Sequence, residues 1–584
     1  MFLGILSIFQ VLFLPGTLVH FIFLRNEPFL KNIPIILSIS VTCNALFGFY
    51  AEKLNLFNTS TFISLIIFEI ILLIILLAKS TNNEKYNFNI NIKDFNFSGL
   101  LASFFILTTF IFFYSRTGNV FSAYDAIVSW NNWAQSWYLG ASPIKTEFYP
   151  QLLPINIAIS NLICGHDTVN LQIFSYFIFL SFFPLSLLII FKFYEYFDSL
   201  NVNLALIFSL IFLGWPFYKT IIHQIGYVDV PVMCLSFISL SYVIFSFYSS
   251  DKSIARKYIF LAIFVAAGAA FTKQAGIFIA IIVLFLSLYV SHQKSLFKNS
   301  LIKFFCIISI VYFLVFLLWY FEAYLNYLEG SNISLIKFHT NDIYSGKPFF
   351  DRILDSFDSY KKEYFLILIS VPVLLVKKYK FYSAIGLMYS FIWILFFTYS
   401  ARNFLLAIPF LCISLSCYFL FFKKFDFKIN KNFKFTININ LLFYILIFFL
   451  SLLSFYFSDE DLLKKNFIER RSIMKLDISE AIYYGFENYG EKRIITTQNN
   501  LIARLPNIPH KTVIPYEFDD DSIVNINYFD QLILTNKNQF LLIDTTIRNM
   551  TPKKNINDKI TNYIDQNVIE LIFSKNDTKL YLIN

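Results

Sequence analysis

The chain has 584 residues, of which 57% are hydrophobic and only 15% are charged, and its formal net charge is +9. Soluble domains carry about 25% charged residues, so this composition excludes an ordinary soluble protein, a disordered chain and a coiled coil. The six cysteines show no CxxC spacing, so neither a disulfide scaffold nor a zinc or redox site is expected. Repeated apolar runs of about 16–24 residues predict a multi-pass α-helical membrane protein.

The apolar runs predict about 14 membrane-spanning helices. The first run has no basic residue before it and is too long for a cleaved signal peptide, so we expect it to remain as a helix. The predicted spans cover residues 2–24, 33–50, 62–78, 98–114, 170–193, 202–217, 228–248, 258–272, 275–290, 304–322, 364–376, 381–398, 403–421 and 438–457.

Basic residues alternate between the connections and predict the topology, because cytoplasmic loops of membrane proteins are enriched in Lys and Arg. Six connections are expected in the cytoplasm because they carry Arg25/Lys31, Lys79/Lys85/Lys93, Lys252/Arg256/Lys257, Lys294/Lys298/Lys303, Lys377/Lys378/Lys380 and Lys423/Lys424/Lys428/Lys431/Lys434. The outer connections, sparser in Lys and Arg for their length, are 51–61, 115–169, 218–227, 323–363 and 399–402. With this placement the net charge reports topology, and no nucleic-acid partner is expected.

The first long outer loop, 115–169, contains a further helical pattern. Trp130, Trp133 and Trp137 recur on one face of a predicted helix over 126–139, with polar residues on the other face and Gly140 as its stop. We expect this helix to lie flat in the membrane interface. The run 154–164 is too short to span and predicts a second interfacial helix.

The composition changes after about residue 458, where charges become nearly balanced. Helical patterns at 478–489 and 556–564, and β-rich runs at 493–497, 540–544, 568–573 and 579–583, predict a small α/β domain over 458–584 on the outer side. Asn576 and Asp577 predict a hairpin turn between the last two strands. The tyrosine-rich loop 323–363 is expected to order over a substrate.

Two acids beside apolar runs are candidate catalytic residues, because an ionisable group near the bilayer is costly unless it is paired or hydrated. Asp125 follows the span 98–114, and Asp229 begins the span 228–248. A carboxylate at the membrane rim can deprotonate an alcohol or hold a divalent cation against a phosphate. Either residue can equally be a helix cap, and the need for a metal is left open.

Two cations on the same predicted face are candidate phosphate-binding residues. Lys273 interrupts an apolar helical hairpin at its outer turn, and Arg402 precedes the span 403–421. An ammonium and a guanidinium there would bind a phosphate and stabilise it as a leaving group. The alternative for each is an interfacial role, with the charge reaching the membrane surface.

The remaining candidates are aromatic and imidazole groups that would contact substrate. Trp130 and Trp133 suit either an aromatic belt at the interface or a platform for a sugar. Tyr149 either contacts substrate or, with Pro150, shapes the entry to the next helix. His223 lies in a short outer loop.

The order of these features resembles the GT-C superfamily of integral-membrane glycosyltransferases, in particular its protein mannosyltransferase and aminoarabinose-transferase branches. The resemblance covers roughly residues 98–457 and rests on four short collinear motifs. These are Tyr124-Asp125-Ala126 with Trp130-Asn131 and Tyr149-Pro150, then Gly226-Tyr-Val-Asp229-Val-Pro231, Thr272-Lys273-Gln-Ala-Gly276, and Arg402-Asn403-Phe404-Leu405-Leu406-Ala-Ile-Pro409.

The resemblance implies an enzyme of the inner membrane, with a three-span extension over 1–97 preceding a catalytic domain over 98–457. It implies inverting transfer of a sugar from a polyprenyl-phosphate donor to a lipid, glycan or protein acceptor on the outer face. In that reaction Asp125 is the general base or binds the acceptor, and Asp229 assists or holds a metal. Lys273 and Arg402 would stabilise the departing phosphate. The alternatives are a transporter or flippase of lipid-linked saccharides and a non-catalytic scaffold for assembly of an envelope polymer.

Overall fold

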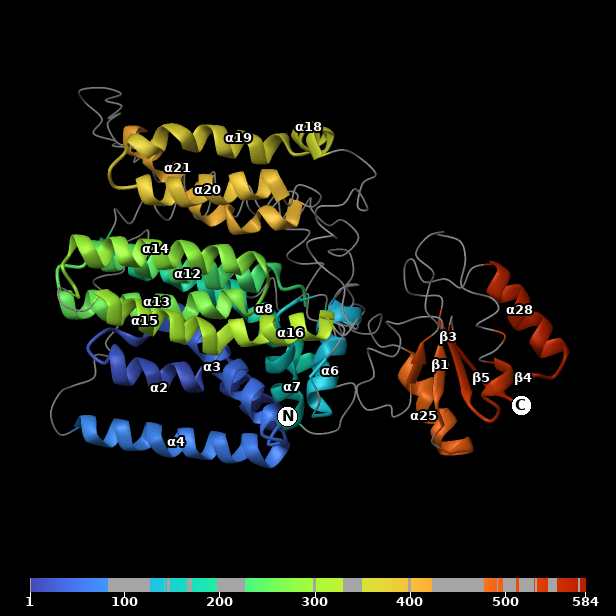
Figure 1. The fold of residues 1–584 in the computed structure, drawn as a ribbon. Helices are drawn as coiled ribbons and strands as arrows, with labels where there is room; N and C mark the ends of the chain where they lie inside the picture. Colours follow the sequence, from blue (N-terminus) through green and yellow to red (C-terminus); the bar gives the residue numbers. More distant parts are fainter. Residues whose placement is uncertain are drawn as a thin grey trace, which may run out of the picture.

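The structure is a computed structural model in which most of the predicted helices are present. It describes residues 2–81, 126–140, 142–143, 146, 148–164, 171–196, 226–297, 301–328, 349–396, 401–422, 477–490, 492–496, 511–513, 530, 533–544, 554–575 and 578–584. These residues form a bundle of apolar helices and a smaller α/β unit (Figure 1).

The predicted first span is broken into two helices. Helix α1 covers Phe2–Leu12, helix α2 covers Leu14–Phe23, and the two meet at an angle of 41°. Pro15 stands in the first turn of α2, where its missing N–H disturbs no helical bond but prevents the preceding helix from continuing. The predicted span over 2–24 is therefore present as a bent pair of helices.

The rest of the bundle follows in chain order, mostly as antiparallel helices. These elements are η1 (Phe29–Asn32), α3 (Ile33–Lys53), α4 (Thr59–Thr81), η3 (Ala126–Asn131), α6 (Asn132–Tyr138), α7 (Leu152–Cys164), α8 (Leu171–Ser186), η4 (Leu187–Ile189), α9 (Ile190–Tyr196), α12 (Asp229–Tyr248), α13 (Lys252–Ala270), α14 (Ala275–Gln293), α15 (Leu301–Tyr312), η5 (Phe313–Leu317), α16 (Leu318–Leu328), α18 (Phe349–Ser359), α19 (Lys361–Ser370), η7 (Val371–Leu375), α20 (Lys380–Phe396), η8 (Ala401–Leu406) and α21 (Ile408–Phe422).

Six of the described helical stretches are long and apolar enough to cross a membrane, and the bent α1–α2 pair is a seventh. They are Phe29–Lys53, Thr59–Ala78, Asp229–Tyr248, Lys252–Ala270, Ala275–Gln293 and Phe304–Asn326. Three predicted spans, 98–114, 202–217 and 438–457, lie outside the described residues. The total of about 14 spans therefore stays a prediction.

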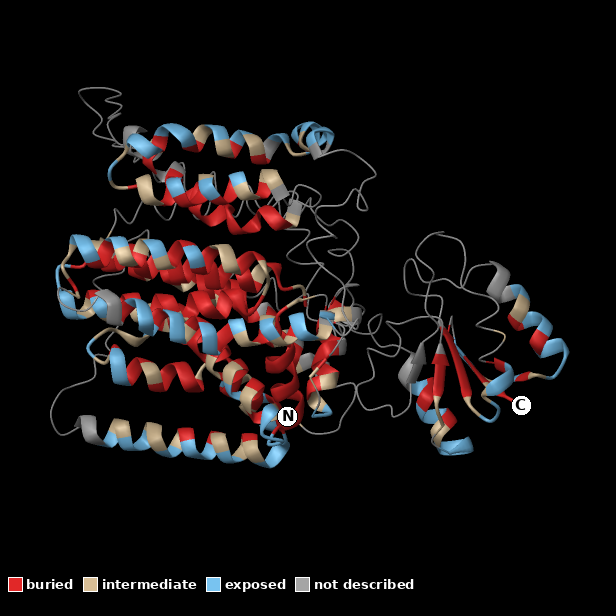
Figure 2. Cartoon of the chain, viewed as in Figure 1, coloured by how far each residue is buried: buried red, intermediate tan, exposed pale blue. Residues whose placement is uncertain are grey.

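Burial separates the centre of the bundle from its edge (Figure 2). In α12, 89% of the spanning residues are buried, whereas in α4 the share is 17%. Helix α4 exposes apolar side chains such as Phe68 and Ile74, which suits contact with lipid chains. Helix α12 therefore lies at the centre of the bundle.

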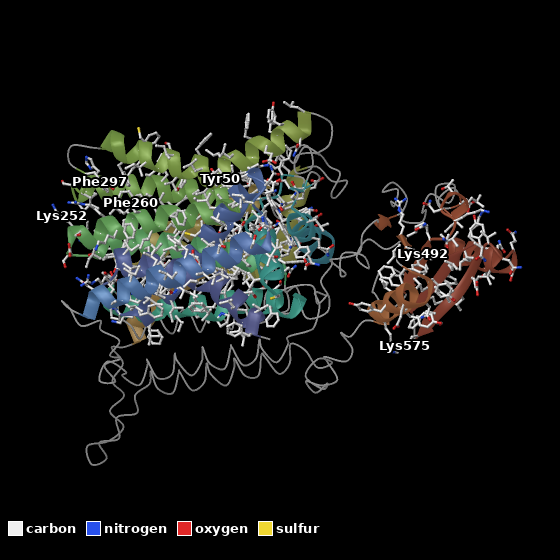
Figure 3. All side chains as sticks on the ribbon, turned by 90° about the horizontal axis from the view of Figure 1, so that it is seen from below. Tyr50, Lys252, Phe260, Phe297, Lys492 and Lys575 are labelled. Carbon is white, nitrogen blue, oxygen red and sulfur yellow. The ribbon has the colours of Figure 1, made fainter. Side chains whose placement is uncertain are left out.

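Two lysines of the connections expected in the cytoplasm mark one end of the bundle. Lys252 begins α13 and Lys294 follows α14, so both lie at one end, which we call the predicted cytoplasmic end (Figure 3). The start of α12 and the turn between α13 and α14 lie at the opposite end, which we call the predicted outer end.

The two helices expected to lie in the membrane interface are covered by other parts of the protein. Trp130, Trp133 and Trp137 are buried, but Asn131 and Gln135 on the polar face are buried as well. Helix α7 is buried along its length up to Ile163. The apolar pattern showed which residues avoid water but not whether protein or lipid covers them.

The α/β unit has a five-stranded sheet in the order β2-β1-β3-β5-β4. Strands β1 and β2, and β1 and β3, run parallel, whereas β5 is antiparallel to both β3 and β4. One face packs on α25 and the other on α28, which gives two separate apolar cores. The elements are α25 (Asp477–Tyr489), β1 (Ile494–Thr496), β2 (Lys511–Val513), β3 (Phe540–Asp544), α28 (Lys554–Asp565), β4 (Ile569–Lys575) and β5 (Thr578–Ile583).

Candidate functional site

The candidate site begins at the first residue of α12. Asp229 is the only acid in the first turn of this helix, and its side chain is buried. The peptide N–H groups of a helix N-terminus favour a negative charge there. Asp229 stands at the first helical position, one residue after the N-cap residue Val228, so it does not occupy the N-cap position itself.

The second part of the site is the tight turn between α13 and α14, which carries Lys273. A Cβ atom on Gly276 would lie 2.1 Å from the carbonyl oxygen of Ala269, so the turn closes only around a glycine. The hydroxyl of Thr272 donates to the carbonyl of Gly268 at 2.8 Å and turns that side chain inward. The Thr-Lys-x-x-Gly motif thus has a local cause, because it holds Lys273 at the tip of the hairpin.

Neighbouring segments fix this turn from outside. The N–H of Leu152, at the start of α7, donates to the carbonyl of Phe271 at 2.9 Å. The hydroxyl of Tyr320 on α16 donates to the carbonyl of Ala270 at 3.3 Å. Both bonds satisfy groups at helix ends that have no partner within their own helix.

The third part of the site is the short helix η8, which places Arg402 and Asn403 side by side in the chain. The Arg402 guanidinium lies 4.8 Å from the centre of the Tyr227 ring, a distance at which a cation is attracted to an aromatic face. Asn403 is buried, and Phe404 after it packs on Trp393, with ring centres 4.8 Å apart.

These three segments meet at Lys273. Its ammonium nitrogen lies 2.5 Å from Oδ1 of Asp229 and 2.9 Å from Oδ1 of Asn403. The side chain of Lys273 keeps 12% of its surface exposed, and that of Asp229 keeps 5%. Among the described residues, this cluster and the neighbouring Arg402 hold two cations and one acid. Such a site can bind an anion.

The aromatic candidates form a compact group of their own. The rings of Trp130 and Trp133 meet edge to face at 4.9 Å, and Tyr149 lies 5.3 Å from Trp130 and 6.0 Å from Trp133. All three belong to the main core of the bundle or pack against it. An exposed aromatic belt is therefore not what they form, and substrate contact stays a prediction.

Trp137 has a structural role that the sequence did not indicate. Its indole N–H donates to Oε1 of Gln151 at 3.0 Å, and its ring packs near Phe57 and Trp319. The same glutamine donates to the carbonyl of Tyr149 at 2.8 Å. These contacts join α6 to the start of α7.

Two of the predicted site residues, Asp125 and His223, lie outside the described residues. The roles of both residues therefore stay predictions. Within the described ranges, no three His, Cys, Asp or Glu side chains come together as metal ligands.

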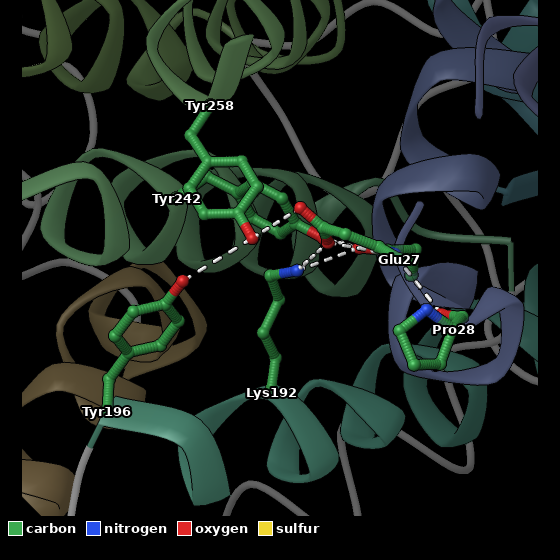
Figure 4. A network of polar contacts seen from close by, with 7 residues as sticks. Glu27, Pro28, Lys192, Tyr196, Tyr242 and Tyr258 are labelled. Carbon is green, nitrogen blue, oxygen red and sulfur yellow. Dashed lines mark hydrogen bonds and ion pairs between the residues drawn. The ribbon is translucent and has the colours of Figure 1, made fainter. Parts of the chain in front are cut away.

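The sequence reasoning missed a second buried lysine, at the predicted cytoplasmic end (Figure 4). Lys192 on α9 is ion-paired with Glu27 and donates to Oδ1 of Asn32 at 3.0 Å. The hydroxyl of Tyr258 donates to Oε1 of Glu27 at 2.7 Å, and that of Tyr242 donates to Asn32 at 2.9 Å. Lys192 lies within an apolar run, so the rule that singled out Asp229 also applied to it.

The Glu27 carboxyl shows how completely this second cluster compensates its charges. Burial alone raises the pKa of Glu27, but the Lys192 charge and the hydrogen bonds from Lys192, Tyr258 and Asn32 outweigh it. The pKa therefore ends below its ordinary value of 4.5. Glu69, in the middle of α4, is a further buried acid that the sequence reasoning passed over.

Comparison with known proteins gives a structural similarity only. No protein-family model and no curated protein matches the sequence. The fold is similar to the crystal structure of ArnT from Cupriavidus metallidurans bound to undecaprenyl phosphate, at 10% identity and a TM-score of 0.45. The match covers 82% of this chain and 97% of that one.

The apo structure of the same protein matches at 9% identity, with the same TM-score and coverage. The chain resembles ArnT.

Proposed function

We propose that this chain is a membrane glycosyltransferase of the GT-C type that takes a sugar from a polyprenyl phosphate. The observation that carries the proposal is the cluster around Lys273, to which α12, the α13–α14 turn and η8 each contribute. A positively charged cluster at the end of membrane-spanning helices suits a ligand with an anionic head and an apolar tail. A lipid phosphate has both parts.

The proposed reaction is a single displacement at the anomeric carbon of the donor sugar. An acceptor hydroxyl oxygen forms the new bond to this carbon while the bond to the phosphate oxygen breaks. The electron pair leaves with the prenyl phosphate, and the hydroxyl proton goes to a carboxylate, for which Asp125 is the candidate. The acceptor, whether lipid, glycan or protein, supplies only the hydroxyl.

In this proposal the described residues act on the leaving group. Lys273 and Arg402 stabilise the charge that grows on the phosphate oxygen as the bond breaks. Asp229 accepts a hydrogen bond from Lys273, so its role is to hold the ammonium in place. Trp130, Trp133 and Tyr149 are proposed to line the path of the sugar, together with His223. We place the reaction, and the C-terminal α/β unit, on the outer face of the inner membrane.

The test uses purified full-length protein in vesicles with a radiolabelled prenyl-phosphate sugar and membrane extract as the acceptor. We expect the label to leave the prenyl lipid and free prenyl phosphate to appear. The variants Asp125→Asn and Lys273→Met should each lose most of this activity. Movement of intact donor across the vesicle membrane without bond cleavage would instead identify a flippase. Full activity of a well-expressed Asp125→Asn protein would remove Asp125 from the mechanism.

A further inference from the structure

The two buried clusters at opposite ends of the bundle have matching polar parts. Each contains a lysine, a carboxylate and an asparagine whose side-chain oxygen accepts a bond from the lysine. At the predicted cytoplasmic end these are Lys192, Glu27 and Asn32, and at the predicted outer end they are Lys273, Asp229 and Asn403. The two asparagines can therefore be compared directly.

The cytoplasmic asparagine uses both halves of its amide. Oδ1 of Asn32 accepts from Lys192 and Tyr242, and its Nδ2 donates to Oε2 of Glu27 at 3.1 Å and to the carbonyl of Pro28 at 3.2 Å. The cluster is closed in this sense, because the amide has both its donor and its acceptor satisfied within the protein.

The outer asparagine uses only one half. An ammonium group has donors but no acceptor, so Oδ1 of Asn403 must face Lys273 and Nδ2 must face away. Nδ2 is buried and has no hydrogen-bond partner in the part of the chain that the structure describes. The Asn403 residue as a whole is 5% exposed. Buried amide donors without a partner are rare because they are costly.

A second unpaired donor lies next to Lys273 in the chain. Nε2 of Gln274, at the start of α14, is also buried and without a partner among the residues described. Among the described residues, the Asn403 amide beside Lys273 and the Gln274 amide that follows Lys273 in the chain thus each keep an unused donor. A ligand that completes this arrangement must offer acceptor oxygens and carry negative charge.

We infer that Asn403 is a binding residue whose Nδ2 donates to a non-bridging phosphate oxygen of a prenyl phosphate. The inference rests on the proposed function. It adds a neutral hydrogen-bond donor, the Asn403 amide, to the two cations Lys273 and Arg402. Lys273 fixes the amide through Oδ1, so the donor is already oriented before the ligand arrives. Pre-orientation of this kind lowers the entropy lost on binding.

The test is equilibrium binding of farnesyl phosphate to purified full-length protein, with farnesol as the uncharged probe. Asn403→Asp keeps the oxygen that faces Lys273 but replaces the donor nitrogen with an oxygen that repels a phosphate. We expect this variant to bind farnesyl phosphate at least about tenfold more weakly than the wild type, which is roughly one charge-assisted hydrogen bond. Binding of farnesol should not change.

Asn32→Asp is the matched control, since it makes the same substitution in the closed cluster and should leave farnesyl phosphate binding unchanged. Equal affinity of Asn403→Asp and wild type would overturn the inference while leaving the proposed function standing. Absence of farnesyl phosphate binding to the wild type would instead contradict the proposed function itself. If Asn403→Asp does not fold, Asn403→Ala decides by the same criterion, because it also removes the donor.

Discussion

The two buried lysines, Lys192 and Lys273, have similar polar partners but differ in how fully the protein surrounds them. Lys192 has 1% of its side chain exposed and lies 4.6 Å and 5.4 Å from the ring centres of Tyr258 and Tyr242. Lys273 has 12% exposed and has oxygen partners on two sides. The first is enclosed by protein, whereas the second keeps a small exposed surface.

The difference follows from how many partners each cluster supplies. Around Glu27 the protein provides an ammonium, a phenol and an amide, which together compensate the burial of the charge. Around Lys273 it provides two acceptors but leaves the Asn403 donor unpaired. A saturated cluster stabilises the fold, and an unsaturated one is where a ligand is expected.

The largest effect should be a loss of stability when the lysine of the closed cluster is removed. Lys192→Met leaves the Glu27 carboxylate buried without its cation, which typically costs about 3–5 kcal/mol of stability. Lys273→Met should cost less, because Asp229 keeps the favourable field of the α12 N-terminus. Thermal unfolding of both variants in detergent measures this. Equal losses for the two variants would remove the distinction between the clusters.

The next largest effect should be on farnesyl phosphate binding. Here Lys273→Met should have the larger effect and the Lys192 variant the smaller one. Lys273→Met removes a charged hydrogen-bond donor from the phosphate and should weaken farnesyl phosphate binding roughly 10–100-fold, or about 1.5–3 kcal/mol. A Lys192 variant that still folds should bind as the wild type does. Titration of the purified proteins measures both affinities, and unchanged binding by Lys273→Met would contradict the assignment of the site.

A pH dependence of stability should appear in the closed cluster. Because the pKa of Glu27 is lower in the folded protein than its ordinary value of 4.5, its contribution to stability is fully present above that pH. The contribution is lost as the pH falls from there through the folded pKa. Melting temperatures measured from neutral to acid pH should therefore drop more for the wild type than for Glu27→Gln. Parallel curves would show that Glu27 is not linked to folding.

The smallest effect should come from Arg402. Arg402→Lys keeps the charge but loses the planar group that lies over Tyr227, a contact worth about 0.5–1 kcal/mol at a partly exposed site. Farnesyl phosphate binding should weaken roughly two- to fivefold. A loss as large as that of Lys273→Met would give Arg402 the leading role instead.

Much of the bundle was predictable because membrane helices need long apolar runs. The spans that became α12, α13 and α14 were located to within a few residues, except that α13 begins earlier, at Lys252. The charge alternation also placed Asp229 and Lys273 at one end, where the structure brings them into contact. Hydrophobic runs and charge placement are local properties, so they can be read from one sequence.

What the sequence could not show is which segments cover one another. The apolar patterns of the Trp-bearing helix and of α7 did not show that protein covers these helices, because an apolar residue looks the same against lipid or protein. The sequence motif gives no role to Asn403. The unpaired amide nitrogen becomes visible only once the structure shows that Lys273 takes up the amide oxygen. The pairing of Lys192 with Glu27 joins residues far apart in the chain and has no local signal beyond the buried charge.

The most direct test of the central claim is mass spectrometry of the lipids that remain bound to the protein after gentle purification. The outer cluster is an open anion site in this account, so wild-type protein should carry polyprenyl phosphate or its sugar-linked form, and Lys273→Met should have lost it. Retention of the same lipid phosphate by both proteins, or its absence from the wild type, would contradict the account.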